Sequence, residues 1–257
     1  MTASEKTRTV VGSGTGGLPV AGLRDFYDDP RVPLAGGGLD RTDQMLFLLD
    51  GIVRAAPRQL RILDVGCGDG AATSQAAARA PGHQVIGMDW SDQAMQQARR
   101  HGLTLIRGGL EAPGLPIADA TVDVVVMSEV IEHLVDPDLA VSEALRVLRP
   151  GGHLLLSTPN LAAWFNRALL AVGVQPVFSE VSLRNVYGRP GNHVAGHLRL
   201  YTARALAQFL AGSGFTDVTL TGAGYHDVPR SLRPFDRMMR RWPSGAAILL
   251  AQARKHG

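Results

Sequence analysis

The chain of 257 residues has one cysteine, two lysines, few aromatic residues and no long apolar run. A single cysteine excludes a disulfide scaffold and a zinc site built from cysteines. No uninterrupted run approaches the ~20 apolar residues that a transmembrane helix needs, and the N-terminal segment lacks the apolar core of a secretory signal. The apolar fraction of 45% is too high for a disordered chain. These absences favour a globular protein with no transmembrane segment, which we expect to be cytoplasmic.

The positive charge of the chain comes almost entirely from arginine, and the formal net charge is only +3. The densest basic cluster comprises Arg230, Arg233, Arg237, Arg240 and Arg241. Because aromatic residues make up only 5% of the chain, nothing resembles a surface on which nucleic-acid bases stack. We therefore interpret the cluster as a solvated face and expect no nucleic-acid partner.

Strand and helix patterns alternate along most of the chain. A helix that Asp40 caps is followed by predicted strands at 61–65, 83–88, 103–106, 122–127 and 153–157, with predicted helices at 71–80, 91–102 and 136–152 between them. A helix capped by Thr202 and two strands, 215–220 and 246–253, close the pattern. Such alternation predicts an α/β, Rossmann-like fold: a seven-stranded, mostly parallel sheet with helices on both faces and a C-terminal antiparallel strand pair.

The rhythm is interrupted after the fifth strand, where we predict a helical insertion. The expected organisation is a flexible N-terminal arm and cap over 1–38, a cofactor-binding core over 39–160, a substrate cap over 161–196 and completion of the core sheet over 197–257. The insertion carries an apolar stripe: Trp164, Phe165, Leu169, Leu170, Val172, Val177 and Phe178. Ordinary packing is the first interpretation of this stripe and a lid the second. A membrane contact comes last, because basic residues are sparse there.

The strongest local motif is ILDVGCGDG at 62–70, at the first strand–helix junction. Its glycines let the backbone turn sharply and approach a ligand closely. Asp89 ends the second strand, where a carboxylate can accept hydrogen bonds from both hydroxyls of a ribose. The glycines alone also fit the looser dinucleotide fingerprint. Asp64, however, lies two residues before the first glycine, where it can hold an ammonium rather than a pyrophosphate.

Five motifs together resemble those of one family. DVGCGDG, MDW, LPIADATVDVVV, EVIEHL and LRPGGHLLLSTPN occur in the order and spacing of class I S-adenosylmethionine-dependent methyltransferases, over roughly 41–160 and 196–255. The EVIEHL and STPN versions are most similar to ubiquinone-biosynthesis O-methyltransferases and related small-molecule enzymes. The resemblance implies S-adenosylmethionine as the cofactor and a small molecule as the methyl acceptor.

The resemblance also implies which residues bind the cofactor. Asp64, Gly66 and Gly68 would line its methionine end, Asp89 would bind the ribose and Trp90 would flank the adenine. The family often has an aspartate where this chain has Gly109, so the Leu110 backbone and Glu111 are expected to supply the adenine contacts. The remaining expected contacts are the Ser128 backbone, toward the methionine amine, and Arg41, toward the cofactor carboxylate.

Three residues are candidates for the chemistry. His133 follows the fourth strand, and an imidazole titrates near neutral pH, so it can act as a base toward an acceptor hydroxyl. The alternative is that His133 only orients a loop. Glu129, Glu132 and His133 also have a spacing that can place them on one divalent cation, and the resemblance implies such a site. A hydrogen-bonded structural role is the first interpretation of both glutamates, with the cation as the alternative.

Two further histidines, His193 and His197, are four positions apart, but neighbouring glycines predict a loop rather than a shared helix face. A structural role is the first interpretation of each, with His193 as a secondary candidate base. Tyr225 and His226 are expected in the acceptor pocket.

We predict from these residues an enzyme that transfers a methyl group to a hydroxyl of a small, rather apolar acceptor. N- or carboxylate methylation of a small natural product or peptide is the alternative within the fold. Two alternatives of other kinds remain open: a nicotinamide-dependent oxidoreductase and a non-catalytic cofactor-binding protein.

Overall fold

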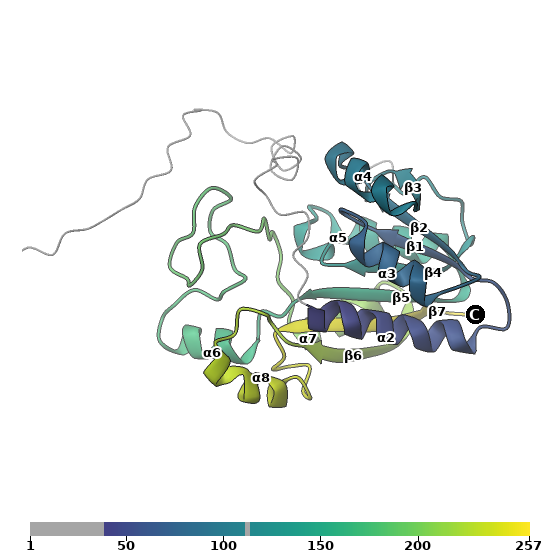
Figure 1. Cartoon of the computed structure of the whole chain (residues 1–257). Coiled ribbons are helices and arrows are strands. Elements are labelled where there is room, and N and C mark those ends of the chain that lie inside the picture. Colours follow the sequence, from purple (N-terminus) through teal and green to yellow (C-terminus); the bar gives the residue numbers. More distant parts are fainter. Residues whose placement is uncertain (1–38, 111–113) are drawn as a thin grey trace, which may run out of the picture.

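A computed structural model describes residues 39–110 and 114–257, which form a seven-stranded sheet with helices around it (Figure 1). The predicted arm at 1–38 and Glu111 lie outside the described residues. The strand order is β3-β2-β1-β4-β5-β7-β6. In chain order the strands are β1 (Arg61–Val65), β2 (Gln84–Asp89), β3 (Thr104–Arg107), β4 (Val122–Ser128), β5 (Leu148–Pro159), β6 (Phe215–Ala223) and β7 (Ile248–Lys255).

Strands β1 to β5 are parallel, and β7 runs antiparallel to both β5 and β6. The predicted fold class is therefore confirmed. Strand β4 lies at the centre of the sheet, and each of its residues from Val122 to Met127 is at most 7% exposed. All of them except Asp123 are apolar. A parallel strand covered on both faces has no solvent side for an alternating polar pattern.

Helices cover the two faces of the sheet in two layers. Helices α2 (Leu39–Ala55) and α3 (Ala71–Arg79) pack on the face that contains Ile62 and Val124, whereas α5 (Pro137–Val147) and α7 (Ala203–Gly212) pack on the face that contains Leu63 and Val125. Successive strand residues point to opposite faces, so Ile62 and Leu63 belong to different cores. Helix α4 (Asp92–Ala98) and the 3₁₀ turn η1 (Arg99–His101) lie beside β2 and β3.

Two predicted element boundaries are wrong. Helix α5 ends at Val147, not at Pro150-Gly151-Gly152, and β5 runs unbroken from Leu148. Leu148 pairs with Val122 of β4, and Arg149 precedes a proline, which disfavours helical backbone. Asp40 lies inside the first turn of α2 rather than before it. Its carboxylate instead accepts the N–H of Gly224 (2.7 Å) and pairs with Arg240 (2.5 Å).

The segments between the later strands gather at the carboxyl edge of the sheet. The insertion after β5 contains α6 (Trp164–Ala171) followed by an irregular loop to Tyr201, and η3 (Arg230–Leu232) with α8 (Arg233–Met239) follows β6. Figure 1 shows α6, α8 and this loop on the same side of the molecule. None of the helices in the described part of the chain is both long and apolar enough to cross a bilayer. Residues of α6 and of the loop that follows it, which we call the cap, line one cavity together with residues at the ends of β1, β2 and β4. Ligands bind at this edge in open α/β sheets.

Candidate cofactor and acceptor site

The turn after β1 brings the backbone close to the place where a ligand would lie. The N–H groups of Gly66 and Cys67 both donate to the carbonyl oxygen of Met88, at 2.8 and 3.0 Å, which ties the turn to the end of β2. Gly66 has φ = +74°, and a Cβ on it would lie 2.5 Å from Cγ2 of Val130. Only glycine adopts this backbone without strain and also fits the space.

Two buried aspartates lie at the carboxyl ends of β1 and β2: Asp64 is the last residue but one of β1, and Asp89 is the last of β2. The carboxylate of Asp64 accepts a hydrogen bond of 2.6 Å from the Thr73 hydroxyl, and burial raises the pKa of Asp64 to about 6. Asp89 accepts the N–H of Gly68 and the N–H of Ser91, each at 2.9 Å. Asp89 therefore holds the glycine turn in place, in addition to any role toward a ligand.

The other predicted cofactor residues that the structure describes line the same cavity: Gly66, Gly68, Trp90, Leu110, Ser128 and Arg41. The Ser128 hydroxyl lies 3.0 Å from that of Ser157 on β5. The cavity has a volume of about 1270 Å³, more than the ~1,000 Å³ upper range for a single small ligand. It therefore has room for a cofactor and an acceptor together.

Arg41 of α2 forms an ion pair of 2.9 Å with Glu129. Glu129 follows β4 in left-handed backbone, with φ = +57°, and its carboxylate also accepts a hydrogen bond of 2.9 Å from Ser157. Strained non-glycine backbone of this kind is concentrated at functional sites. The ion pair also occupies the carboxylate of Glu129, so the spacing of Glu129, Glu132 and His133 does not by itself place all three on one cation.

Glu132 and His133 lie in the 3₁₀ turn η2 (Ile131–His133) and are joined by a residue from the cap loop. His197 places its ring centroid 5.0 Å from that of His133. Ligand atoms of Glu132, His133 and His197 all lie within 4.8 Å of one another. Among the described residues, the group whose ligand atoms converge therefore contains His197 beside Glu132 and His133, and it does not contain Glu129.

The hydrogen bonds of the two imidazoles define which nitrogen points into the site. His133 Nδ1 lies 3.2 Å from the Gly196 carbonyl oxygen, and His197 Nδ1 lies 2.9 Å from that of Phe178. A carbonyl only accepts, so these bonds place a proton on each Nδ1, and Nε2 of the neutral His133 imidazole is then an acceptor. His133 Nε2 lies 3.8 Å from Oε1 of Glu132.

Burial controls the charge of this group. It lowers the pKa of His133 to about 3, helped by the neighbouring His197, so the imidazole is neutral at physiological pH. It also raises the pKa of Glu132 well above its usual value, with the charge of Glu129 as a second cause. Glu132 is 0% exposed; its Oε2 accepts from Thr158 at 3.0 Å, while its Oε1 has no hydrogen-bond partner among the described residues.

The cap supplies the apolar part of the cavity. Trp164, Phe165, Phe178 and Tyr225 line it and pack on one another, with neighbouring ring centroids 5.2–6.2 Å apart. His193 and His226 also line it, as exposed side chains. The site thus has a polar, acidic half on the sheet and an aromatic half on the cap.

Sequence reasoning missed the joint position of His197 and the role of Glu180. The Glu180 side chain is 2% exposed and pairs with Arg189 at 2.9 Å. Its carboxylate accepts the N–H groups of Ala195 (2.6 Å), Gly196 (2.7 Å) and His197 (2.9 Å). No local pattern signals these contacts, because they join positions 15 to 17 residues apart in an irregular loop.

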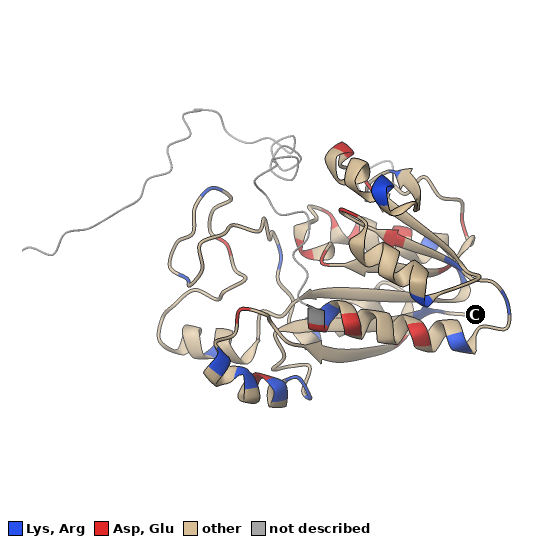
Figure 2. Cartoon of the chain, in the orientation of Figure 1, with Lys and Arg blue, Asp and Glu red and all other residues tan. Residues whose placement is uncertain are grey.

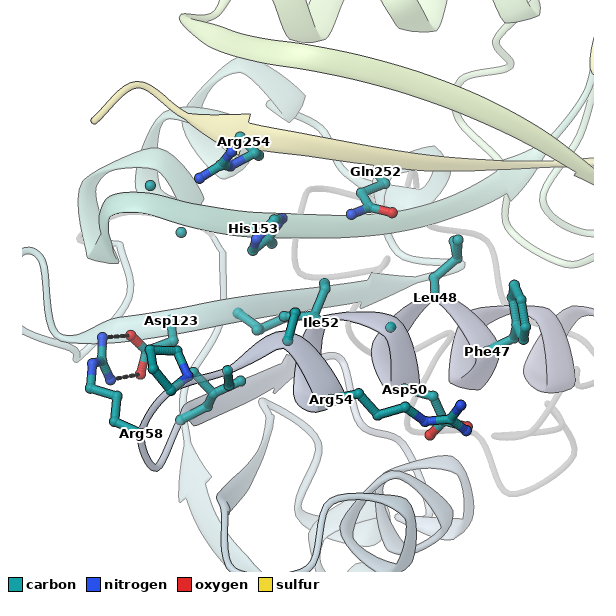
Figure 3. Close-up of a pocket in the computed structure, with 18 of the residues that line it drawn as sticks. Phe47, Leu48, Asp50, Ile52, Arg54, Arg58, Asp123, His153, Gln252 and Arg254 are labelled. Carbon is teal, nitrogen blue, oxygen red and sulfur yellow. Dashed lines mark hydrogen bonds and ion pairs between the residues drawn. The ribbon is translucent and has the colours of Figure 1, made fainter.

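A second hollow of about 700 Å³ lies between α2 and the sheet, at the opposite end of β4 (Figure 3). Two acids line it: Asp50 pairs with Arg79 at 2.9 Å, and Asp123 pairs with Arg58 at 2.6 Å and Arg149 at 2.9 Å. Although burial raises the pKa of Asp123, hydrogen bonds from Arg58, Arg149 and the N–H of Arg61 outweigh it and lower the pKa to about 2. Asp123 is therefore a structural anchor, and the candidate site residues lie in the larger cavity.

Comparisons with known proteins agree with this geometry. The family described as "Methyltransferase domain" matches residues 40–220. A ubiquinone biosynthesis O-methyltransferase of Mesorhizobium japonicum is 32% identical over 66% of this chain and 65% of its own length. A protein of Mycobacterium tuberculosis named "probable S-adenosylmethionine-dependent methyltransferase" is 34% identical over 66% of this chain and 54% of its own length.

The fold agrees with the same assignment. The crystal structure of an S-adenosylmethionine-dependent methyltransferase from Thermotoga maritima superposes with a TM-score of 0.54 at 17% identity, over 84% of this chain and 91% of that one. The chain spans less than two thirds of the length of the curated relatives that it matches first. The family match over most of the chain, on a sheet with a glycine turn and two buried acids at its carboxyl edge, shows that the chain belongs to the S-adenosylmethionine-dependent methyltransferases.

Proposed function

We propose that this protein transfers the methyl group of S-adenosylmethionine to a hydroxyl of a small, rather apolar acceptor. The observation that carries the proposal is the position of His133, whose Nδ1 faces the Gly196 carbonyl and whose ring lines the cavity shared by the acidic glycine-turn half and the aromatic cap. An alcohol or phenol must lose a proton during methylation, and Nε2 of His133 is placed to accept it, although burial makes this imidazole a weaker base than a free one. The name of the Mesorhizobium relative, an O-methyltransferase, supports the same kind of acceptor atom.

The acidic half would hold the cofactor. Asp64 would accept the ammonium and Asp89 the ribose hydroxyls, while Gly66 and Gly68 would let the methionine end approach the backbone. Ser128 and Arg41 would complete the methionine end. Trp90 and Leu110 would face the adenine, together with Glu111, which lies outside the described residues. A cation with an ammonium group and a sulfonium suits a cavity that contains several carboxylates.

The aromatic half would hold the acceptor. Residues 161–196 would act as the substrate cap, because Trp164, Phe165 and Phe178 turn their rings into the cavity that the cofactor residues line. The sulfonium is already a strong electrophile, so holding the acceptor oxygen in line with it supplies most of the acceleration. His133 would remove the proton, with Glu132 beside it. His193, on the exposed part of the cap loop, is the secondary candidate base.

The residues around His133 also fit a divalent cation. Oε1 of Glu132 is buried without a hydrogen-bond partner among the described residues, and His133 and His197 each pair Nδ1 with a carbonyl. Metal-binding histidines are commonly oriented in this way. Glu132, His133 and His197 would hold the cation, which would lower the pKa of an acceptor hydroxyl.

The first experiment identifies the product without a guess about the acceptor. Cell extract is incubated with the protein and deuterated-methyl S-adenosylmethionine, and mass spectrometry locates the labelled methyl group. We expect a labelled ether on an apolar compound. A label on nitrogen or on a carboxylate would replace the hydroxyl proposal with one of the alternatives.

The second experiment tests His133 with the acceptor so identified. We expect His133→Ala to lower kcat by about 10²-fold or more and to leave the Kd of S-adenosylhomocysteine within about twofold. His153→Ala, at the far end of the sheet, is the matched control. Equal kcat in wild type and His133→Ala would remove His133 from the mechanism.

The same assay separates the base from the cation. If a metal takes part, dialysis against a chelator abolishes turnover, added divalent metal restores it, and His197→Ala loses as much activity as His133→Ala. Turnover that survives chelation would leave His133 as the base alone.

A further inference from the structure

Helices α6 and α8 and the residues beside them present large apolar side chains to solvent. Six large apolar side chains on and beside these helices are 42–74% exposed: Leu170, Val172, Leu232, Phe235, Met238 and Trp242. The two helices are joined by Trp164, whose ring centroid lies 5.0 Å from that of Phe235 and whose Nε1 donates to Asp236 at 3.0 Å. We call this surface the α6–α8 face. Apolar surface gathered in this way marks an interaction site more often than a solvated region.

Arginines surround the apolar side chains of this face. Arg230, Arg233, Arg237 and Arg241 are exposed, and none of them forms an ion pair with an acid among the described residues. Segments 161–174 and 230–244 together contain six arginines and a single acid, Asp236, which is buried; the whole chain carries a net charge of only +3. Figure 2 shows the basic residues gathered along α8, beside α6. The α6–α8 face is therefore strongly positive.

The tertiary structure changes the charge around the insertion and so reopens the membrane contact that the sequence ranked last. Basic residues are sparse within the insertion itself, but the fold places the arginines of α8 against it. The apolar residues Leu232, Phe235, Met238 and Trp242 recur every three or four positions, as on one side of a helix, with arginines between them. This pattern of tryptophan, phenylalanine and leucine beside arginine is typical of helices that lie in the interface of a bilayer.

We propose that the α6–α8 face docks on the surface of a membrane that contains anionic lipids. The arginines would contact the phosphate headgroups, and the apolar side chains would enter the boundary with the acyl chains. A nucleic acid would neutralise the arginines but leave the apolar side chains exposed to water. A bilayer surface provides partners for both.

Docking would also connect the membrane to the cavity. Val172 and Leu232 belong to the α6–α8 face and line the cavity as well. An apolar acceptor dissolved in the bilayer would therefore reach the site beside these two residues. This route rests on the proposed function, whereas docking itself does not.

Vesicle sedimentation of the full chain tests docking without any acceptor. We expect the protein to pellet with vesicles of 70% phosphatidylcholine and 30% phosphatidylglycerol, and to remain in solution with pure phosphatidylcholine. Replacing three arginines (Arg233→Gln, Arg237→Gln and Arg241→Gln) is expected to weaken binding at least tenfold. The matched control replaces three exposed arginines elsewhere: Arg99→Gln, Arg100→Gln and Arg204→Gln.

A second readout follows the apolar side chains directly. We expect Trp242 to shift its fluorescence to the blue on the anionic vesicles and to be quenched by brominated lipid, and Trp242→Phe to lose that signal. Each variant must still bind S-adenosylhomocysteine, which shows that it is folded. No pelleting with anionic vesicles, equal loss in the control set, or binding to polyglutamate as strong as to vesicles would overturn the proposal.

Discussion

Asp64 and Asp89 show how two identical side chains at the ends of neighbouring strands acquire different properties. Both side chains are buried, but Asp89 accepts two backbone N–H groups, whereas Asp64 accepts the hydroxyl of Thr73. Burial raises the pKa of Asp64 from 3.8 to about 6. Between those values the folded protein binds a proton that the unfolded chain does not, so the free energy of unfolding falls as pH rises through that window. The full cost of ionising this carboxyl in the empty protein is about 3 kcal/mol.

This cost predicts how cofactor affinity depends on pH. An ammonium needs the ionised form of Asp64, which is the minor form at pH 5 and the major form at pH 7. We expect the Kd of S-adenosylhomocysteine to be about tenfold higher at pH 5 than at pH 7, measured by isothermal titration. Asp64→Asn is expected to bind S-adenosylhomocysteine weakly at both pH values, with the same Kd at pH 5 and pH 7. If the Kd of Asp64→Asn still rises from pH 7 to pH 5, another group causes the pH dependence.

At the scale of elements, the cap loop is organised around one carboxylate. Glu180 accepts three consecutive backbone N–H groups and pairs with Arg189, which is itself 7% exposed. The same stretch of loop presents the Gly196 carbonyl to His133 and carries His197. Glu180 is therefore a positioning residue for the histidine pair, although it does not touch the glycine turn.

We expect Glu180→Gln to loosen this loop, because it leaves the buried Arg189 charge without its partner. Trypsin should then cleave after Arg184 faster, and kcat should fall about tenfold, while the Kd of S-adenosylhomocysteine stays within twofold. Asp123→Asn is the matched control, since Asp123 also binds arginine and a backbone N–H, but at the far end of β4. Equal loss of kcat in both variants would indicate a general loss of stability instead.

At the scale of the whole molecule, the polar half of the cavity is built by the sheet and the aromatic half by the cap, so a ligand bound between them should stabilise the fold. At a concentration 100 times its Kd, a ligand adds about 2.7 kcal/mol to the free energy of unfolding. For a chain of this size we expect S-adenosylhomocysteine to raise Tm by roughly 5–10 °C, measured by calorimetry. NADH should produce no shift, and Asp89→Ala should abolish the shift with S-adenosylhomocysteine. An equal shift with NADH would favour the nicotinamide alternative.

Much of the fold could be predicted because it depends on neighbours along the chain. The predicted caps at Ser91, Asp136 and Thr202 each accept the expected backbone N–H. The alternation of buried strands and helices predicted the sheet, and the glycine turn predicted the location of the site. The end of α5 was predicted wrongly because the pairing of Leu148 with Val122, a contact across the sheet, decides it.

The sequence by itself determined the family, the parallel sheet and the glycine turn with its two aspartates, because these depend on residue types within a few positions of one another. Only the tertiary structure decided that His197 joins Glu132 and His133, and that the arginines of α8 lie beside the apolar insertion. His133 and Gly196 are 63 positions apart, and Trp164 and Asp236 are 72 apart. Local sequence patterns do not show how the chain folds back over such distances. The tertiary structure therefore decides which charged groups, aromatic rings and carbonyls come into contact.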